Sequence, residues 1–332
     1  MNPSDFSYLA PWWLPGGNAQ TIWAARASRR HLGPAPRWQR QRWATPDGDF
    51  IDVDHAVHAS AANAPMLVLF HGLEGSSASQ YAVAFADFAA ARGVAYAVPH
   101  FRGCSGELNQ APRAYHSGDF AEIDWVLQRF AQDNPGRPLL AVGISLGGNA
   151  LLRWAGEMGE TARQHVRAVA AVCSPLDLSA GGHAIGRGFN RLVYTRLFMQ
   201  TMVPKALKKL EQHPGLFDRG ALLAARDLYE FDNLFTAPLH GFRDTEDYWH
   251  RASAKPVLNR IRVPALALNA RNDPFVPATS LPTKQDAGPQ VTLWQPERGG
   301  HVGFPVAQGP FGLPGHVLAM PEAVGNWLLA HV

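Results

Sequence analysis

The pentapeptide Gly-Ile-Ser-Leu-Gly at residues 143–147 constrains the fold of this chain more than any other stretch. It follows the apolar run 138–142 directly and precedes a helix-like stretch at 149–158. A serine hydroxyl becomes a useful nucleophile when a tight strand-to-helix turn pushes it out of a sheet, beside a base and amide donors. Because the chain contains 31 glycines, the strand-turn-helix context supports this interpretation more than the motif does. The sequence therefore predicts a nucleophile elbow with Ser145 at its tip.

Apolar runs of strand length alternate with helix-like stretches along most of the chain. Runs that are apolar throughout predict a parallel sheet covered by helices on both faces, and ligands on such sheets bind at the carboxyl ends of the strands. The alternation stops over residues 180–254, where we expect helices and loops that form a cap above the strand ends. The expected strands are 65–70, 94–98, 138–142, 166–173, 263–268 and 291–294, and the expected helices are 79–91, 119–130, 149–158 and 321–331.

The first 60 residues follow a different pattern. Residues 1–35 are rich in Pro, Gly and Trp, which predicts an arm packed on the body rather than a regular element. Alternating residues at 38–44 and 50–57 flank the turn sequence Pro-Asp-Gly-Asp, which predicts a β-hairpin. A chain of this length can bury one large core. We expect a single domain over residues 1–332, with an N-terminal arm and hairpin at 1–60 and a helical cap inserted at 175–260.

Candidate partners for the serine follow two of the later strands. A serine nucleophile needs a histidine to accept its proton and a carboxylate to fix the tautomer of that histidine, in the chain order Ser, Asp/Glu, His for a turn of this kind. His301, in a glycine-rich segment after the last expected strand, is the candidate base. Asp273, after the preceding strand, is the candidate acid, and Asp177 is its rival. Because the oxyanion needs two backbone donors, we expect them to be the amides of Leu73 and Leu146.

Two titratable residues, His71 and Glu74, lie near the expected oxyanion site in the sequence. His71 could act as a base, but a histidine inside this loop is more typical of a brace, and we expect a structural role. Glu74 follows the Leu73 amide, where its charge would oppose the developing oxyanion. We expect its carboxylate to turn away into an ion pair, with Arg102 as the candidate partner.

The cap segment contains an apolar stretch at 192–199. Leu197 and Phe198 within it are candidate wall residues for an acyl chain. The same helical spacing is also typical of residues that form the core of the cap itself. The two interpretations are compatible.

Composition excludes several classes of function. The net charge is +3, but Lys and Arg are scattered, and the densest cluster, Arg26 to Arg42, is interrupted by prolines and a tryptophan, so we expect no nucleic-acid partner. Cys104 and Cys173 have no metal-ligand or redox spacing, and we expect neither metal nor cofactor. No basic leader or long apolar run is present, which predicts a cytoplasmic protein without a transmembrane segment. Peripheral membrane contact and the oligomeric state stay open.

Seven short segments, at 46–50, 71–77, 101–106, 115–118, 143–149, 272–275 and 300–304, together carry a resemblance over nearly the whole chain. They resemble the YheT-like branch of the α/β-hydrolases, which also contains mammalian α/β-hydrolase-domain proteins that act on phospholipids. The resemblance implies an α/β-hydrolase fold with a mostly parallel central sheet, flanking helices and a helical cap. Ser145, Asp273 and His301 match the positions of the family's catalytic triad.

The chain departs from the family at one place. The family usually has a histidine and a leucine before Gln-Thr, whereas residues 18–21 here are Asn-Ala-Gln-Thr. No substrate role is carried over for that N-terminal histidine. The positions of the triad are unaffected.

We therefore expect a serine hydrolase that cleaves carboxylic esters through an acyl-enzyme, with short- to medium-chain acyl or lipid-like esters as its small-molecule substrates. One alternative is acyl transfer to an acceptor other than water, and another is lipase or phospholipase activity on the same three residues. A binding protein without catalytic activity is a further alternative. The presence of all three triad residue types argues against it.

Overall fold

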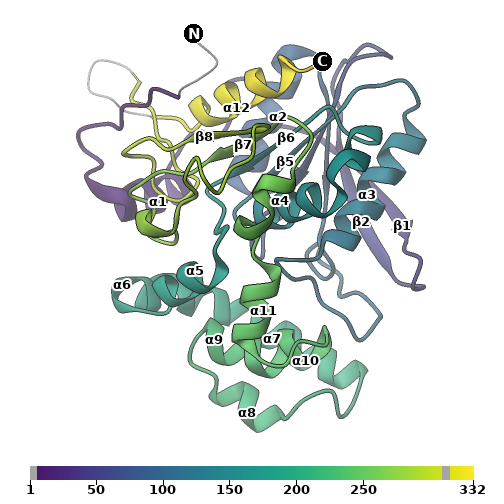
Figure 1. Cartoon of the computed structure of the whole chain (residues 1–332), viewed down its shortest axis with the longest axis vertical. Coiled ribbons are helices and arrows are strands. Elements are labelled where there is room, and N and C mark those ends of the chain that lie inside the picture. The colour runs from purple at the N-terminus through teal and green to yellow at the C-terminus, as the bar shows by residue number, and fades with distance from the viewer. Residues whose placement is uncertain (1–5, 309–314) are drawn as a thin grey trace.

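An eight-stranded sheet forms the centre of the molecule, in a computed structural model that describes residues 6–308 and 315–332 (Figure 1). The strand order is β1-β2-β4-β3-β5-β6-β7-β8. The β1–β2 and β2–β4 pairs are antiparallel, and every later pair is parallel. The expected hairpin and all six expected apolar strands are present. The strands are β1 Trp38–Ala44, β2 Phe50–Ala56, β3 Met66–Phe70, β4 Ala95–Pro99, β5 Leu139–Ile144, β6 Ala168–Val172, β7 Ala265–Leu268 and β8 Val291–Trp294.

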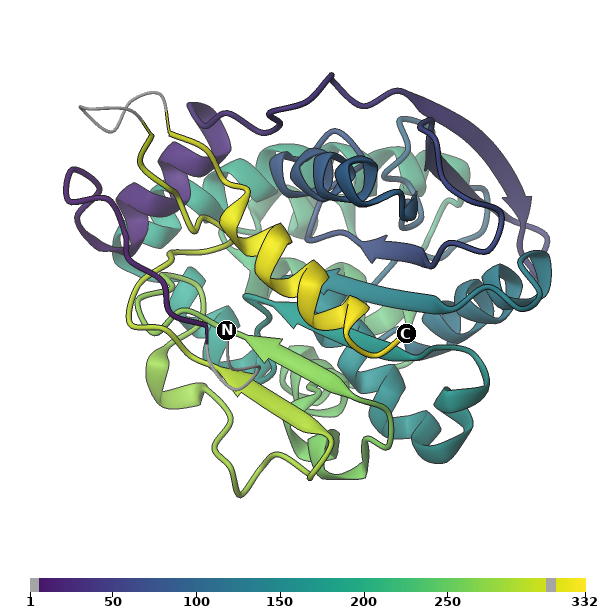
Figure 2. The same ribbon diagram turned by 90° about the horizontal axis from the view of Figure 1, so that it is seen from above.

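Helices cover both faces of this sheet, which is why its inner strands are apolar throughout. In β3, Val68 packs into a core with α3 (Phe120–Asp133) and α4 (Leu146–Met158). Its neighbour Leu67 points to the other face, against α2 (Gln80–Arg92) and α12 (Ala319–Leu329). Figure 2 shows α12 lying across the sheet when the molecule is seen from above. The mostly parallel, two-sided sheet and flanking helices predicted from the sequence are confirmed.

The helical cap lies between β6 and β7 in the chain and below the sheet in Figure 1. Four of its helices begin directly after an aspartate whose carboxylate accepts a hydrogen bond from an amide three residues on, which is the usual N-cap. The helices are α5 Leu178–Ile185, α6 Gly188–Asn190, α7 Arg196–Gln212, α8 Arg219–Ala224, α9 Leu228–Phe231, α10 Ala237–Leu239 and α11 Thr245–Ala252, with π-helical segments at Arg191–Thr195 and Asp232–Thr236.

The two ends of the cap meet where they join the body. The amide of Lys255 donates to the carbonyl of Leu176 at 2.9 Å. Asn149 of α4 binds the returning end twice, because its amide donates to Ala252 O and its carbonyl accepts from Ala254 N, both at 2.9 Å. The cap is therefore fastened to the helix that follows the elbow.

The N-terminal segment contains a helix, α1 (Gly16–Arg26), so the expectation of an irregular arm over residues 1–35 is wrong there. Pro15, the N-cap residue, is extended, and Gly16 has a φ of 75°, which glycine adopts readily, so the helix begins at this Pro-Gly pair. Gln20, Thr21 and Ala24 are buried, which shows that tertiary contacts stabilise α1. Residues 1–5 of that arm lie outside the described residues.

Within residues 6–308 and 315–332, none of the helices combines the length and the apolar character needed to cross a bilayer.

Candidate active site

Ser145 lies at the tip of the turn between β5 and α4. Its φ of 52° and ψ of −117° are rare for a residue with a side chain, and such strain persists only where the surroundings hold it. Its amide donates to Val172 O at 2.8 Å. A side chain at Gly143 or Gly147 would collide with nearby backbone atoms, so both glycines of the motif are needed for the turn. The strand-turn-helix geometry is the one that the sequence predicts.

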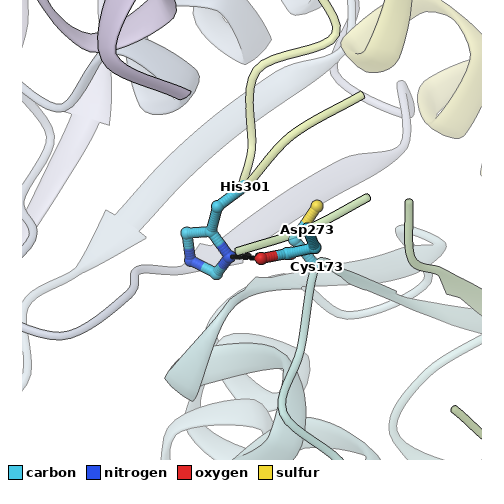
Figure 3. Close-up of side chains that lie close together, drawn as sticks. All are labelled: Cys173, Asp273 and His301. Atoms are coloured by element: carbon cyan, nitrogen blue, oxygen red, sulfur yellow. Dashed lines mark hydrogen bonds and ion pairs between the residues drawn. The ribbon is translucent and has the colours of Figure 1, made fainter. Parts of the chain in front are cut away.

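Three side chains from three separate loops form one hydrogen-bonded chain. Ser145 Oγ lies 3.0 Å from His301 Nε2. His301 Nδ1 lies 2.9 Å from Asp273 Oδ2, and Figure 3 shows this second contact. The Asp273 carboxylate also accepts from the amides of Phe275, at 2.8 Å, and Val276, at 3.3 Å. Its side chain is fully buried, whereas that of His301 is 10% exposed. These contacts fix the carboxylate while the imidazole remains open to the site.

Asp177, the alternative candidate for the acid, lies at the start of the cap. Asp177 is the N-cap of α5, where its carboxylate accepts from Ala180 N at 3.0 Å. Among the residues that the structure describes, it makes no hydrogen bond or ion pair with His301. The structure therefore brings Asp273, and not Asp177, to the histidine.

Cys173, Asp273 and His301 also form a cluster of potential metal ligands, with one atom of each within 4.8 Å of the others (Figure 3). The sulfur of Cys173 accepts from Val302 N at 3.2 Å and its thiol donates to Gly300 O at 3.6 Å. Burial raises the pKa of this thiol well above its ordinary value, so it stays protonated. Metal ions bind thiolates, and the imidazole nitrogen is already paired with the carboxylate, so the cluster does not fit a metal site.

The loop after β3 holds the Leu73 amide between two amides that are bound by tyrosine side chains. The amide of Gly72 donates to the Tyr81 hydroxyl at 3.0 Å, and the amide of Glu74 donates to the Tyr115 hydroxyl at 2.9 Å. Between them, the Leu73 amide has no acceptor among the described residues. A tyrosine on each side thus fixes the loop and leaves the middle donor available.

The second expected donor, the Leu146 amide, is in the first turn of α4, where amides have no acceptor within the helix. Leu73, Leu146 and Ser145 line the same cavity. Gly72 brings the two backbones together, since a side chain there would lie 3.3 Å from Ser145 Cβ. The three residues therefore border one space.

His71 is placed as a brace, as the sequence analysis expects. It is fully buried, with Nδ1 2.8 Å from Gly72 O, and its Nε2 accepts from the amide of Phe101 at 3.0 Å. Burial lowers its pKa to about 3, so the ring is neutral at physiological pH. Both ring nitrogens are engaged by backbone groups, which leaves none to accept a proton from the serine.

The expected Glu74–Arg102 ion pair is wrong. Glu74 is bound by Lys205 of the cap, with 2.8 Å between Nζ and Oε2. Arg102 is bound by Asp49 at 3.0 Å and Glu122 at 2.5 Å. The carboxylate does turn away into an ion pair, but its partner comes from α7, a helix whose approach to this loop depends on how the cap folds back over the body.

A cavity of about 170 Å³ lies between the strand ends and the cap. Phe198 lines it, whereas Leu197 is 45% exposed on the outer surface and does not line it. Consecutive helical residues point about 100° apart, and of these two only Phe198 faces the cavity. The candidate role as an acyl wall therefore stays with Phe198. The cavity walls include Phe198, Met202, Phe231, Phe235, Trp249 and Phe275.

One carboxyl group in this apolar wall has no signal in the sequence. Asp232 begins a π-helical segment and lines the cavity. It accepts from Thr236 Oγ1 at 2.6 Å and from Trp249 Nε1 at 2.9 Å. Burial raises its pKa to about 6. Nothing in the local sequence distinguishes it from a solvated helical aspartate, because its burial depends on how the cap helices pack.

Comparison with known proteins gives a match to one protein family and several relatives in sequence. Residues 65–308 match the family described as alpha/beta hydrolase fold. A protein of Escherichia coli strain K12 named "Putative esterase YheT" is 40% identical over 282 residues, which cover 84% of this chain and 82% of that protein. "Phospholipase ABHD3" of Mus musculus is 29% identical, over 82% of this chain and 67% of that protein.

The fold also resembles solved structures. The esterase Pf2001 of Pyrococcus furiosus superposes with a TM-score of 0.56, over 91% of this chain and 98% of that one. At 14% identity this likeness concerns the fold alone. The sequence relatives, which include an esterase and a phospholipase by name, add the type of enzyme. The chain belongs to the α/β-hydrolase family and is a hydrolase of its esterase and lipase type.

Proposed function

We propose that the protein hydrolyses carboxylic esters through an acyl-enzyme formed on Ser145. The observation that supports this is the chain from Ser145 Oγ to His301 Nε2, at 3.0 Å, and from His301 Nδ1 to Asp273, at 2.9 Å. In such a chain the hydroxyl attacks the acyl carbon while the imidazole accepts its proton, and the imidazolium then protonates the leaving alcohol. Water repeats the sequence on the acyl-enzyme and releases the acid. Asp273 holds the tautomer with the proton on Nδ1 and stabilises the imidazolium.

The oxyanion of each tetrahedral intermediate needs preorganised donors. The amides of Leu73 and Leu146 are our candidates, because each lacks an acceptor in its own segment and both residues line the cavity with Ser145. Removal of one such donor costs about 10²–10³ in kcat in other serine hydrolases. The Glu74–Lys205 ion pair supports this assignment, since it neutralises the carboxylate next to the Leu73 amide.

The size and lining of the cavity support a short- to medium-chain acyl group. An apolar protein cavity of about 150 Å³ accepts a benzene molecule, and this one measures about 170 Å³. Each buried methylene adds about 0.8 kcal/mol of binding. Phe198 is our candidate wall residue for the acyl chain.

A lipase or phospholipase acting through the same three residues is the second candidate. It is supported by the relative named a phospholipase, of which this chain covers 67%. Both candidates share the acyl-enzyme and differ in the alcohol that leaves.

The nucleophile is tested with a fluorophosphonate probe, followed by peptide mapping. We expect the label on Ser145 alone, and we expect Ser145→Ala to lose both labelling and hydrolysis of p-nitrophenyl esters of two to twelve carbons. Ser60→Ala, at an exposed serine remote from the elbow, serves as the control and should match the wild type. A label on another residue, or an active Ser145→Ala protein, would overturn the proposal.

A further inference from the structure

The buried side of α1 carries the Gln-Thr pair at residues 20 and 21, for which the ester-hydrolase mechanism has no role. We define the acid loop as residues 271–275 and the histidine loop as residues 299–303. Gln20 is fully buried, and its side-chain oxygen Oε1 accepts from Gly299 N at 2.9 Å and from Asn272 Nδ2 at 3.1 Å. One oxygen atom of α1 therefore binds both loops at once.

Thr21 adds a contact at the histidine itself. Its hydroxyl accepts from His301 N at 2.8 Å and donates to Gly17 O, one turn earlier, at 2.7 Å. The two loops are also joined directly, because Asn272 Oδ1 accepts from Gly300 N at 3.0 Å. Four consecutive amides of the histidine loop, those of residues 299–302, thus donate to side chains, and two of these side chains belong to α1.

The histidine loop needs such support because its backbone is strained. Val302 has a φ of 55° and Phe304, just beyond the loop, has a φ of 42°, in the left-handed region that residues with side chains rarely adopt. Strain of this kind costs on the order of 1–3 kcal/mol per residue and persists where surrounding contacts impose it. The loop would relax if those contacts were lost.

The fit between α1 and the two loops leaves no room for adjustment. A side chain at Gly17 would collide with the carbonyl of Asn272, and one at Gly300 would lie 2.7 Å from Gly17 O. One at Gly303 would lie 2.8 Å from Gln20 O. The backbone of α1 therefore lies against the backbone of both the acid loop and the histidine loop. A small shift of α1 must move these loops.

We infer that Gln20 and Thr21 are positioning residues, which set the place of His301 relative to Ser145 and Asp273. The inference rests on the proposed ester hydrolysis, since it assigns a task within that mechanism. Gln20 fixes the spacing between the acid loop and the histidine loop, and Thr21 fixes the backbone from which the imidazole projects. A displacement of about 1 Å in a reacting group can lower turnover by about 10².

The test uses isosteric substitutions that remove only the polar atoms. Thr21→Val keeps the shape but loses the hydroxyl, and Gln20→Met keeps the length but loses the amide. For each we expect kcat for p-nitrophenyl esters to fall 10- to 100-fold with KM changed less than threefold, and the rate of fluorophosphonate labelling to fall in proportion. Thr21→Ser, which retains the hydroxyl, should recover kcat to within threefold of the wild type.

Ala24→Gly separates positioning from stability. Ala24 is fully buried in α1 but packs against Ala84, Val317 and Leu318 rather than against the loops. A glycine there lowers helix stability by about 1 kcal/mol. With all variants assayed well below their unfolding temperatures, we expect Ala24→Gly to keep the wild-type kcat.

Two results would overturn the inference: wild-type kcat in folded Thr21→Val, or an equal loss of kcat in Ala24→Gly. If Gln20→Met fails to fold, the Thr21 pair of variants decides. Failure of the underlying function is distinguishable, because it would appear as activity or labelling that survives in Ser145→Ala, whatever the α1 variants do.

Discussion

The body and the cap of this protein hold their polar groups in different ways. In the body, the candidate catalytic side chains lie on loops after β5, β7 and β8, and neighbouring backbone amides or side chains fix each one. In the cap, the cavity wall is mostly aromatic and aliphatic, two segments are π-helical, and Asp232 keeps a carboxyl group in apolar surroundings. The body therefore fixes the geometry of the candidate catalytic side chains, and the cap sets the shape of the cavity.

This difference implies that turnover and substrate choice respond to different mutations. A change in the body should alter kcat for every ester alike, because the same atoms react each time. A change in the cavity wall of the cap should alter the ranking of esters while the serine keeps its reactivity.

The largest expected effect is in the body, at Asp273. Asp273→Asn keeps the size of the side chain but favours the wrong tautomer of His301, which lowers kcat by about 10⁴ in a serine protease with this triad. We expect a comparable loss for esters of every acyl length, measured as initial rates with p-nitrophenyl substrates. The matched control is Asp177→Asn at the N-cap of α5, which should retain most of the activity. The reverse ranking would move the acid to Asp177.

The next effect concerns the interface between the two regions. The ring centroids of His116, in the body, and His240, in the cap, are 4.3 Å apart. Burial lowers the pKa of both, that of His240 to about 3. The folded protein thus keeps His240 neutral while the unfolded chain takes up a proton below pH 6.5, so stability is lost as the pH falls from about 6.5 towards 3.

At pH 5 this linkage amounts to about 2 kcal/mol for His240 alone. His240→Gln should therefore lose less stability than the wild type between pH 7 and pH 5, measured by urea unfolding at both values. His31→Gln, at a surface histidine far from the cap, should leave the difference unchanged. Equal losses in His240→Gln and the wild type would contradict the assignment.

The smallest effect is in the cap, at the cavity wall. Phe198→Ala removes an aromatic ring from the cavity and should move the preferred p-nitrophenyl ester to a longer chain, because each methylene that fits raises kcat/KM severalfold. Leu197→Ala, one residue earlier on the outer surface, is the control and should leave the length profile unchanged. Labelling of Ser145 should be unaffected in both variants. Identical profiles in both would place the acyl site elsewhere.

Much of the fold of the body could be predicted from the sequence, because the patterns that indicate it are local. Each strand is an apolar run with helices on either side, and Ser145, Asp273 and His301 each come soon after such a run. Carboxyl ends of parallel strands share one edge, so residues at these ends are expected to meet. The positions of these three residues could therefore be predicted without knowledge of contacts between distant parts of the chain.

The rest depended on contacts that the sequence does not encode locally. Pro and Gly at the start of α1 resemble loop residues until the buried contacts of Gln20 and Thr21 are known. The partner of Glu74 is Lys205, whose helix approaches only in the folded cap. The π-helical segment before α7 shifts the helical phase, so a period of 3.6 cannot decide which of the next two apolar residues faces inward.

The way in which the cap joins the body has a consequence for how this scaffold can diversify. Its chain leaves after β6 and returns before β7, two neighbouring strands, and hydrogen bonds from Lys255 to Leu176 and from Leu178 to Ser253 join the two ends. A segment whose ends already touch can be lengthened, shortened or exchanged without displacing the strands beside it. Asn149 binds the returning end from a helix of the body and so provides a constant attachment point. If the proposed function holds, an exchange of the cap would let the same reacting residues act on new esters.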